Sequence, residues 1–177
     1  MYNVAIVGGG PAGIFAALEI MKLKPDWKVV LIEKGQKIEN RKCPLREGSP
    51  ICTNCKRCGL LCGWGGAGAF SDGKLTLTPD VGGNLVDYMP RKEVEDLIEY
   101  ADNLYLQYGA TDEVFGTDKK IFEEIERQAT LAELKLVYSP VRHLGTERSL
   151  DVLKNMQDYL DEKITILNNV SVKSLIV

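Results

Sequence analysis

The stretch YNVAIVGGGPAGIFAALEIMKLKPDWKVVLIEK, residues 2–34, decides the fold that this sequence predicts. Residues 4–7 form a short apolar run, which is typical of a strand buried on both faces of a parallel sheet. After a glycine-rich turn, apolar residues from Ile14 to Met21 recur at helical spacing. Pro25 ends that helix, and residues 28–32, which are apolar from Val29 onward, form a second buried strand. We therefore expect a strand, a tight turn, a helix and a second, parallel strand.

The turn of this unit has the pattern G-x-G-x-x-G, formed by Gly8, Gly10 and Gly13. The first glycine permits the bend, the second lets the backbone approach a pyrophosphate, and the third lets helix and strand pack closely. Exposed amides and the positive end of the helix dipole favour a phosphate there. Glu33, which ends the second strand, can accept hydrogen bonds from ribose hydroxyls. The context predicts a dinucleotide site, and the turn alone does not choose between NAD and FAD.

The length and composition favour one soluble domain. The chain has 177 residues, an apolar content of 45%, a charged content of 27% and a formal net charge of -3, which gives no reason to expect nucleic acid as a partner. No apolar run approaches the length of a membrane span, and the start of the chain does not have the pattern of a signal peptide. We therefore expect a cytoplasmic protein that does not bind membranes. In that reducing compartment its cysteines favour metal or redox chemistry over disulfides.

Four cysteines stand close together, at Cys52, Cys55, Cys58 and Cys62, and Cys43 precedes them. The spacing C-x2-C-x2-C-x3-C is the ligand run of bacterial [4Fe–4S] ferredoxins, although glycine follows the run here instead of proline. Either Cys62 or Cys43 can supply the fourth ligand. A zinc site, a redox-active C-x-x-C pair and simple packing thiols remain alternatives. The basic residues around the run would offset the charge of thiolates.

The sequence resembles the two-dinucleotide-binding-domain flavoproteins, and among them uncharacterised FAD-dependent dehydrogenases. The resemblance rests on GGGPAG (8–13), on Glu33-Lys34 followed by Arg41, and most specifically on GWGGAGAFSDGKL (63–75). It continues through HLGTERSLDVLKNMQDYL (143–160). It implies a Rossmann-like FAD-binding domain with a cysteine-rich loop and a helical insertion, incomplete at its carboxyl end.

The resemblance also implies where the cofactor is held. Arg41 would lie near the FAD diphosphate, the second glycine run would approach the pyrophosphate and flavin, and the backbone at Val172 would hold the adenine. Lys74 would lie at the flavin edge. His143 is the only histidine, and we expect either a proton donor or a structural residue there. The implied cofactor-binding residues are Gly8, Gly10, Pro11, Ala12, Gly13, Glu33, Lys34, Arg41, Gly65, Gly66, Ala67, Gly68, Ser71 and Val172.

The implied activity is that of an FAD-dependent oxidoreductase that transfers hydride or electrons through the flavin. Its partners would be a small-molecule substrate and either NAD(P)H or a redox protein. The alternative is a non-catalytic or a nucleic-acid- or protein-modifying FAD-binding module with a structural zinc site.

Three parts are expected along the chain. Residues 1–80 form the FAD-binding unit with the loop 36–76, residues 81–145 form a mainly helical insertion on the substrate side, and residues 146–177 return to the FAD domain. Apolar periodicity predicts further helices over residues 91–108, 118–134 and 149–160. Further strands are predicted over residues 136–138, 164–167 and 170–177.

Overall fold

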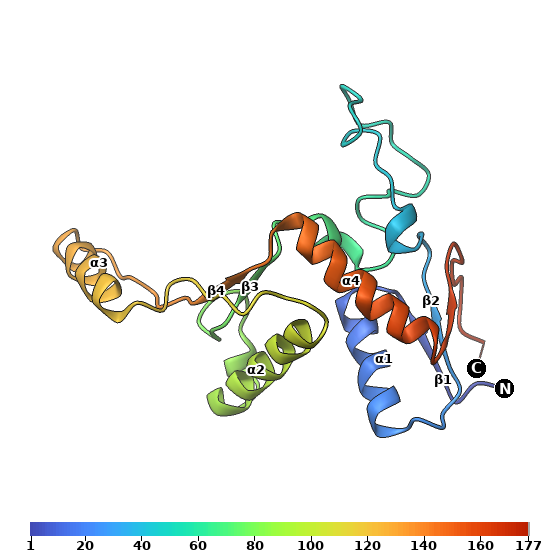
Figure 1. The fold of residues 1–177 in the computed structure, drawn as a ribbon, viewed down its shortest axis with the longest axis horizontal. Helices are drawn as coiled ribbons and strands as arrows, with labels where there is room; N and C mark the ends of the chain where they lie inside the picture. Colours follow the sequence, from blue (N-terminus) through green and yellow to red (C-terminus); the bar gives the residue numbers. More distant parts are fainter. Residues whose placement is uncertain (177) are drawn as a thin grey trace. The chain divides into compact units, whose positions relative to one another are not determined.

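The fold is mixed α/β, and the computed structural model describes residues 1–176 (Figure 1). The strands are β1 (Val4–Val7), β2 (Val29–Ile32), β3 (Lys74–Thr76), β4 (Val141–His143) and β5 (Thr165–Leu167). The α-helices are α1 (Pro11–Leu23), α2 (Arg91–Gln107), α3 (Lys119–Leu131) and α4 (Gly145–Asp161). Short 3-10 helices are η1 (Ile38–Asn40), η2 (Gly66–Phe70) and η3 (Leu85–Asp87). The predicted order of strand, turn, helix and parallel strand over residues 2–34 is confirmed.

The described chain divides into two compact units. The first combines Met1–Ser71 with the chain from Ser149 onward, and the second is Asp72–Arg148. The first unit contains β1, α1, β2, the cysteine-rich loop and β5, and the second contains β3, α2, α3 and β4. None of the helices over residues 1–176 is both long and apolar enough to cross a membrane.

The first unit is organised by a parallel sheet with the order β1-β2-β5. Val4 lies opposite Val29, and Val30 lies opposite Thr165. The central strand β2 is buried through Val29, Val30 and Leu31, as its apolar sequence predicts. β1 instead lies at the edge of the described sheet, and its residue Val7 is 61% exposed. The expectation that β1 is buried on both faces is therefore wrong.

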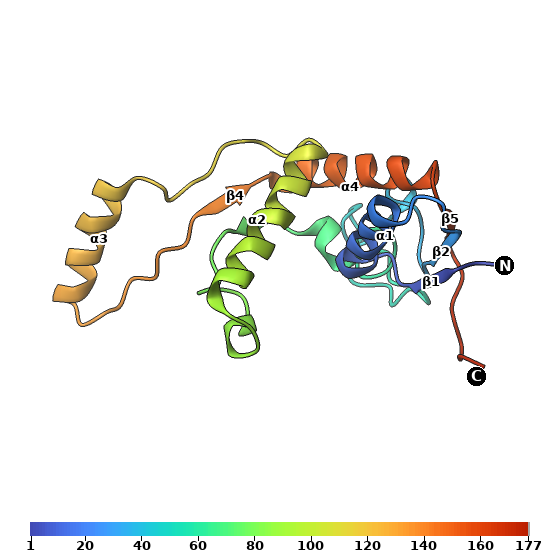
Figure 2. The ribbon, with the colours of Figure 1, turned by 90° about the horizontal axis from the view of Figure 1, so that it is seen from below.

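The core of the first unit forms where α1 and the later part of α4 pack beside this sheet (Figures 1 and 2). α1 follows the turn after β1, and the chain then returns to start β2 parallel to it. Because apolar residues recur every three or four positions, each helix presents one apolar face. The buried side chains are Ile14, Ala17, Leu18 and Met21 of α1 and Val152, Leu153, Met156 and Leu160 of α4.

The second unit is built around the antiparallel pair β3 and β4. Arg142 of β4 is buried, and its guanidinium makes two hydrogen bonds of 2.6 Å to the two carboxylate oxygens of Asp102 in α2. These bonds hold α2 against β4 and raise the pKa of Arg142. Because the pairing is bidentate, it fixes the orientation of α2 relative to β4 as well as its position.

Two predicted strands are absent from the described residues. Residues 136–138 are not a strand, because β3 pairs with residues 141–143 instead, and a strand needs a hydrogen-bonding partner. Over residues 170–176 the chain also forms no strand. The amides of Asn169 and Val170 bond to the loop after β2, and the chain then leaves the sheet. The last residue, Val177, lies outside the described residues.

Candidate functional site

Two glycine-rich segments of the first unit lie directly against each other. The Gly65 amide donates to the Gly9 carbonyl at 2.7 Å. A Cβ atom placed on Gly66 would lie 3.4 Å from the Cα atom of Gly10 and 3.7 Å from the Cδ atom of Pro11. The structure therefore brings the predicted turn at residues 8–13 together with the predicted run at residues 65–68.

The glycines of the first turn have different surroundings. Gly8 has a φ of +107°, a conformation that favours glycine. A Cβ atom on Gly13 would lie 2.0 Å from the Gly8 carbonyl oxygen, so only glycine lets α1 approach this closely. Gly10 has a φ of -80°, and its Cβ position has no atom within 4 Å apart from its chain neighbours. The chain itself therefore does not need a glycine at position 10, whereas a ligand that approaches this turn would.

The start of α1 is suited to a negatively charged group. The helix begins with Pro11, no side chain caps it, and its first turn has no acidic residue. Amides at a helix start that lack a capping side chain, and the positive end of the helix dipole, attract anions. Ala12 is exposed beside Pro11. The partial positive charge at the helix start and the open space at Gly10 therefore suit a phosphate group.

Glu33 is buried, and its carboxylate binds three backbone amides. Oε2 accepts from Gly9 at 2.7 Å, and Oε1 accepts from Gly35 at 2.7 Å and from Gly63 at 2.9 Å. These amides belong to the first turn, to the segment after β2 and to the start of the second glycine run. Glu33 therefore ties three loops together. Since a carboxylate has about four acceptor sites, roughly one is left for a ribose hydroxyl.

Arg41 is also buried, and it donates to backbone carbonyls. Its guanidinium makes hydrogen bonds of 2.6–3.0 Å to the carbonyl oxygens of residues 59, 60, 64 and 66. It also lies 4.7 Å from the ring centroid of Phe70. Burial lowers the pKa of Arg41, and the nearby Glu33 carboxylate opposes that shift. In this structure Arg41 holds the cysteine-rich loop and the second glycine run in one arrangement.

The second glycine run is anchored by Trp64, which is fully buried. Its indole Nε1 donates to the carbonyl of Leu153 in α4 at 2.8 Å. Beyond this anchor, Ala67 and Gly68 are exposed, and the Ser71 hydroxyl donates to the Gly68 carbonyl at 2.9 Å. The tip of the run is therefore accessible, while its base is fixed in the core.

Replacing Trp64 by phenylalanine is expected to lower the free energy of unfolding by about 1–2 kcal/mol, because the Leu153 carbonyl loses its buried donor. Trp27 provides the control, since it is 41% exposed, and its replacement by phenylalanine should change stability by less than ~0.5 kcal/mol. Urea unfolding followed by circular dichroism measures both. Equal midpoints for the two variants would contradict this role of Trp64.

The two predicted catalytic residues, Lys74 and His143, face each other across the β3–β4 pair of the second unit. Both are exposed. The ammonium group of Lys74 lies 2.8 Å from the carboxylate of Asp72, and this hydrogen bond lowers the pKa of Asp72. The His143 ring makes an edge contact with Phe115, with 6.4 Å between ring centroids. This pairing could not be predicted from the sequence, because the two residues are far apart in the chain.

Two other predicted cofactor residues lie apart from the glycine turns in the sequence. Lys34 follows Glu33 and is exposed. Val172 is 38% exposed and lies in the irregular segment after β5. Their predicted contacts with the diphosphate region and the adenine remain predictions.

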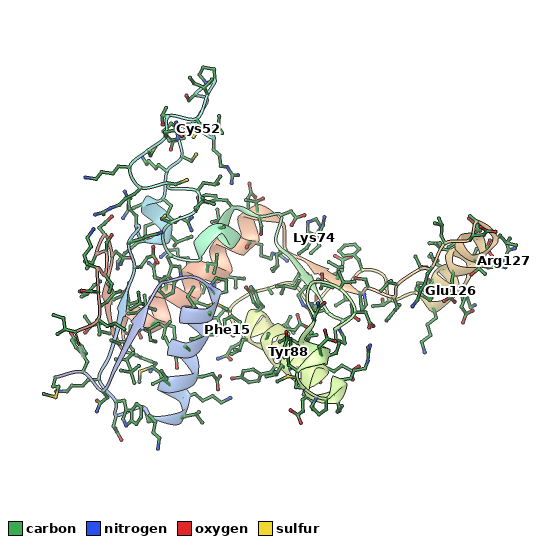
Figure 3. All side chains as sticks on the ribbon, turned by 180° about the vertical axis from the view of Figure 1, so that it is seen from behind. Phe15, Cys52, Lys74, Tyr88, Glu126 and Arg127 are labelled. Atoms are coloured by element: carbon green, nitrogen blue, oxygen red, sulfur yellow. The ribbon has the colours of Figure 1, made fainter. Side chains whose placement is uncertain are left out.

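The cysteines are all free thiols in a loop that extends from the first unit. Figure 3 shows Cys52 near the outer part of this loop. Cys52 and Cys55 are exposed, whereas Cys43, Cys58 and Cys62 are partly buried. Over residues 1–176, no three His, Cys, Asp or Glu side chains lie in an arrangement that could hold a metal ion. A metal centre would therefore require this loop to close around it.

The trio of Trp64, Glu33 and Arg41 forms a structural support that sequence reasoning did not predict. Burial of Trp64 could have been predicted, since a tryptophan between glycines is a large apolar side chain that favours the core. Glu33 and Arg41 were predicted from the motif as cofactor contacts, and their backbone partners are visible only once the loops are folded together.

Comparisons with known proteins give limited matches. No family model matches the chain. An uncharacterised protein from Clostridium beijerinckii is 32% identical over 127 residues, which covers 69% of this chain and 22% of that protein. The match thus spans about a fifth of that relative's length.

Among solved structures, L-amino acid deaminase from Proteus myxofaciens, in complex with anthranilate, matches at 13% identity. That match covers 95% of this chain and 38% of the deaminase, and its TM-score of 0.42 supports no inference about this chain.

Proposed function

We propose that the first unit is a Rossmann-like dinucleotide-binding unit that binds FAD, and that the protein is a flavin-dependent oxidoreductase. The observation that carries the proposal is the contact between the two glycine segments, with open space at Gly10 beside the uncapped start of α1. Two glycine segments in contact offer the backbone amides at the start of α1 to a diphosphate and the exposed tip at Ala67 and Gly68 to a planar ring.

The proposed roles combine this geometry with the resemblance to flavoproteins. The turn at residues 8–13 would hold the diphosphate, and the exposed tip at Ala67 and Gly68 would approach the isoalloxazine ring. Glu33 has about one acceptor site left for a ribose hydroxyl, and Val172 would contact the adenine. FAD, when bound, supplies hydride or electron transfer, and the protein supplies binding and orientation.

The remaining roles concern the second unit and the partners. Lys74 and His143 lie opposite each other in β3 and β4, and both are exposed, so each could hold a substrate group or supply a proton. We propose a small-molecule substrate and NAD(P)H or a redox protein as the electron partner, in the cytoplasm. We also propose that the cysteine-rich loop holds an iron–sulfur cluster rather than zinc. The compact spacing of the cysteines favours a cluster over zinc, and the free thiols and surrounding basic residues suit a thiolate-held centre of either kind.

A Gly10→Val variant tests the dinucleotide site. Since φ at Gly10 is -80° and its Cβ position is open, the variant should fold. Its side chain would occupy the space that a diphosphate needs, so its affinity for FAD should fall roughly tenfold to a hundredfold. Titration of the chain with FAD, followed by quenching of flavin fluorescence, measures this change. A parallel titration with NAD separates the two dinucleotides.

Ala16→Val is the matched control, because it adds a branched side chain to an exposed position one turn further along α1. It should leave FAD affinity unchanged. The proposal fails if the wild-type chain takes up no FAD, or if Gly10→Val and Ala16→Val bind FAD equally well while both remain folded.

A further inference from the structure

Four of the five cysteines line one hollow in the cysteine-rich loop. Its volume is about 320 Å³, and its walls include Cys43, Cys52, Cys55 and Cys58. Cys62 does not line it. Cys62 and Cys58 instead line a smaller hollow of about 70 Å³, which also has Arg41, Lys42 and Arg57 in its walls.

We propose that Cys43, Cys52, Cys55 and Cys58 are the ligands of the cysteine-held centre, and that Cys62 is not a ligand. This inference rests on the proposed metal centre and assigns its ligands. It excludes the ferredoxin-like use of all four cysteines of the run.

Cys43 is held next to Cys58 by close backbone packing. A Cβ atom on Gly59 would lie 2.0 Å from the carbonyl oxygen of Lys42, so the segment around residue 42 touches the segment around residue 59. Arg41 reinforces this contact by donating to the Gly59 carbonyl at 3.0 Å. Cys43 and Cys58 adjoin this contact, and both line the larger hollow.

The backbone around Cys62 is held by a different set of contacts. The Cys62 amide donates to the Cys58 carbonyl at 2.8 Å, which closes a turn. The next amide, that of Gly63, donates to buried Glu33 at 2.9 Å. A Cβ atom on Gly35 would lie 2.5 Å from the carbonyl carbon of Cys62, so this backbone is packed against the end of β2. Bringing Cys62 into the larger hollow would break these contacts.

The other two ligands have freedom to adjust. Cys52 and Cys55 are exposed, and the Cys55 thiol lies 3.2 Å from the hydroxyl of Thr53, within their own exposed segment. Pro44 and Leu45 add apolar walls to the hollow. A cluster binds each thiolate to a different iron and so holds its ligands further apart than a single zinc ion does. A roomy hollow with thiols on its rim therefore suits a cluster better.

The test compares Cys43→Ser with Cys62→Ser. The chain and its variants are reconstituted without oxygen with ferrous iron and sulfide, and iron and sulfide are measured per chain together with visible absorbance. The wild-type chain should hold about four irons and four sulfides. Cys43→Ser should lose most of the iron, and Cys62→Ser should keep the wild-type content. Circular dichroism checks that both variants fold.

A second variant tests the packing argument with every cysteine present. Gly59→Ala should push the segments around residues 42 and 59 apart and lose most of the iron. Gly83→Ala, whose Cβ position is open, should not. The ligand assignment is overturned if Cys62→Ser loses the iron while Cys43→Ser keeps it. A wild-type chain that takes up no metal would instead overturn the metal centre itself. If the chain instead binds one zinc ion that is lost in Cys43→Ser and kept in Cys62→Ser, the ligand assignment is upheld and the iron–sulfur cluster is overturned.

Discussion

Replacing Arg41 by methionine is expected to lower the free energy of unfolding by about 3 kcal/mol or more, because each buried carbonyl that loses its donor costs roughly 1–3 kcal/mol. Methionine keeps much of the length and the apolar stem of arginine but has no donor. The variant leaves the carbonyls of Gly59, Leu60, Trp64 and Gly66 without their guanidinium partner. Since Arg41 is only 7% exposed, little water is positioned to replace it.

Arg46 provides a matched control for this prediction. Its guanidinium lies 4.8 Å from the same Phe70 ring, but the residue is exposed, and its guanidinium donates a long hydrogen bond of 3.5 Å to the Phe70 carbonyl. Arg46→Met should therefore change stability by less than ~0.5 kcal/mol. Urea denaturation of both variants, followed by circular dichroism and tryptophan fluorescence, measures the difference. Similar unfolding midpoints for the two variants would show that Arg41 does not support the loops.

An Arg41→Lys variant separates charge from geometry. Lysine keeps the positive charge near Glu33 but cannot present a planar fork to several carbonyls at once. If the charge alone matters, lysine should restore most of the stability that methionine loses. The observed hydrogen bonds to four separate carbonyls predict that lysine restores only a small part.

The elements that the sequence predicted correctly are those determined by residues close together in the chain. The apolar run of β1, the glycine turn and the helical spacing of α1 lie within one continuous stretch, and the periodicity of each is visible there. The helices α2, α3 and α4 were also predicted within a few residues of their observed ends, because each has an apolar face.

The parts that the sequence did not predict depend on partners far along the chain. β3 lies inside a glycine-rich motif and becomes a strand only because residues 141–143 pair with it. For the same reason, residues 136–138 look like a strand by composition but have no partner. In the candidate site, the dinucleotide motif predicted Glu33 as a cofactor contact, and the family resemblance implied Arg41. Their backbone partners could not be predicted, since those lie up to 30 residues away.

Glu33→Ala is expected to lower the free energy of unfolding by about 3 kcal/mol or more in the absence of any ligand. The buried amides of Gly9, Gly35 and Gly63 lose their acceptor, and each unpaired buried donor costs roughly 1–3 kcal/mol. Glu33→Gln should have a smaller effect. Its one oxygen can still accept from Gly35 and Gly63, while its amide group would face the Gly9 amide, which is also a donor.

Measuring both FAD affinity and ligand-free stability separates the two roles of Glu33. A residue that serves only as a ribose ligand would change FAD affinity and leave the stability of the ligand-free chain untouched. A residue that ties three loops together would change both, with the order wild type, glutamine variant, alanine variant in unfolding free energy. Glu47→Ala is the control, because Glu47 is an exposed acid of the cysteine-rich loop. Ligand-free Glu33→Ala with wild-type stability would contradict the structural role. The Glu33 carboxylate positions the backbone of both glycine segments. If the unfolding free energies follow this order, Glu33 variants lose FAD partly because these loops have loosened.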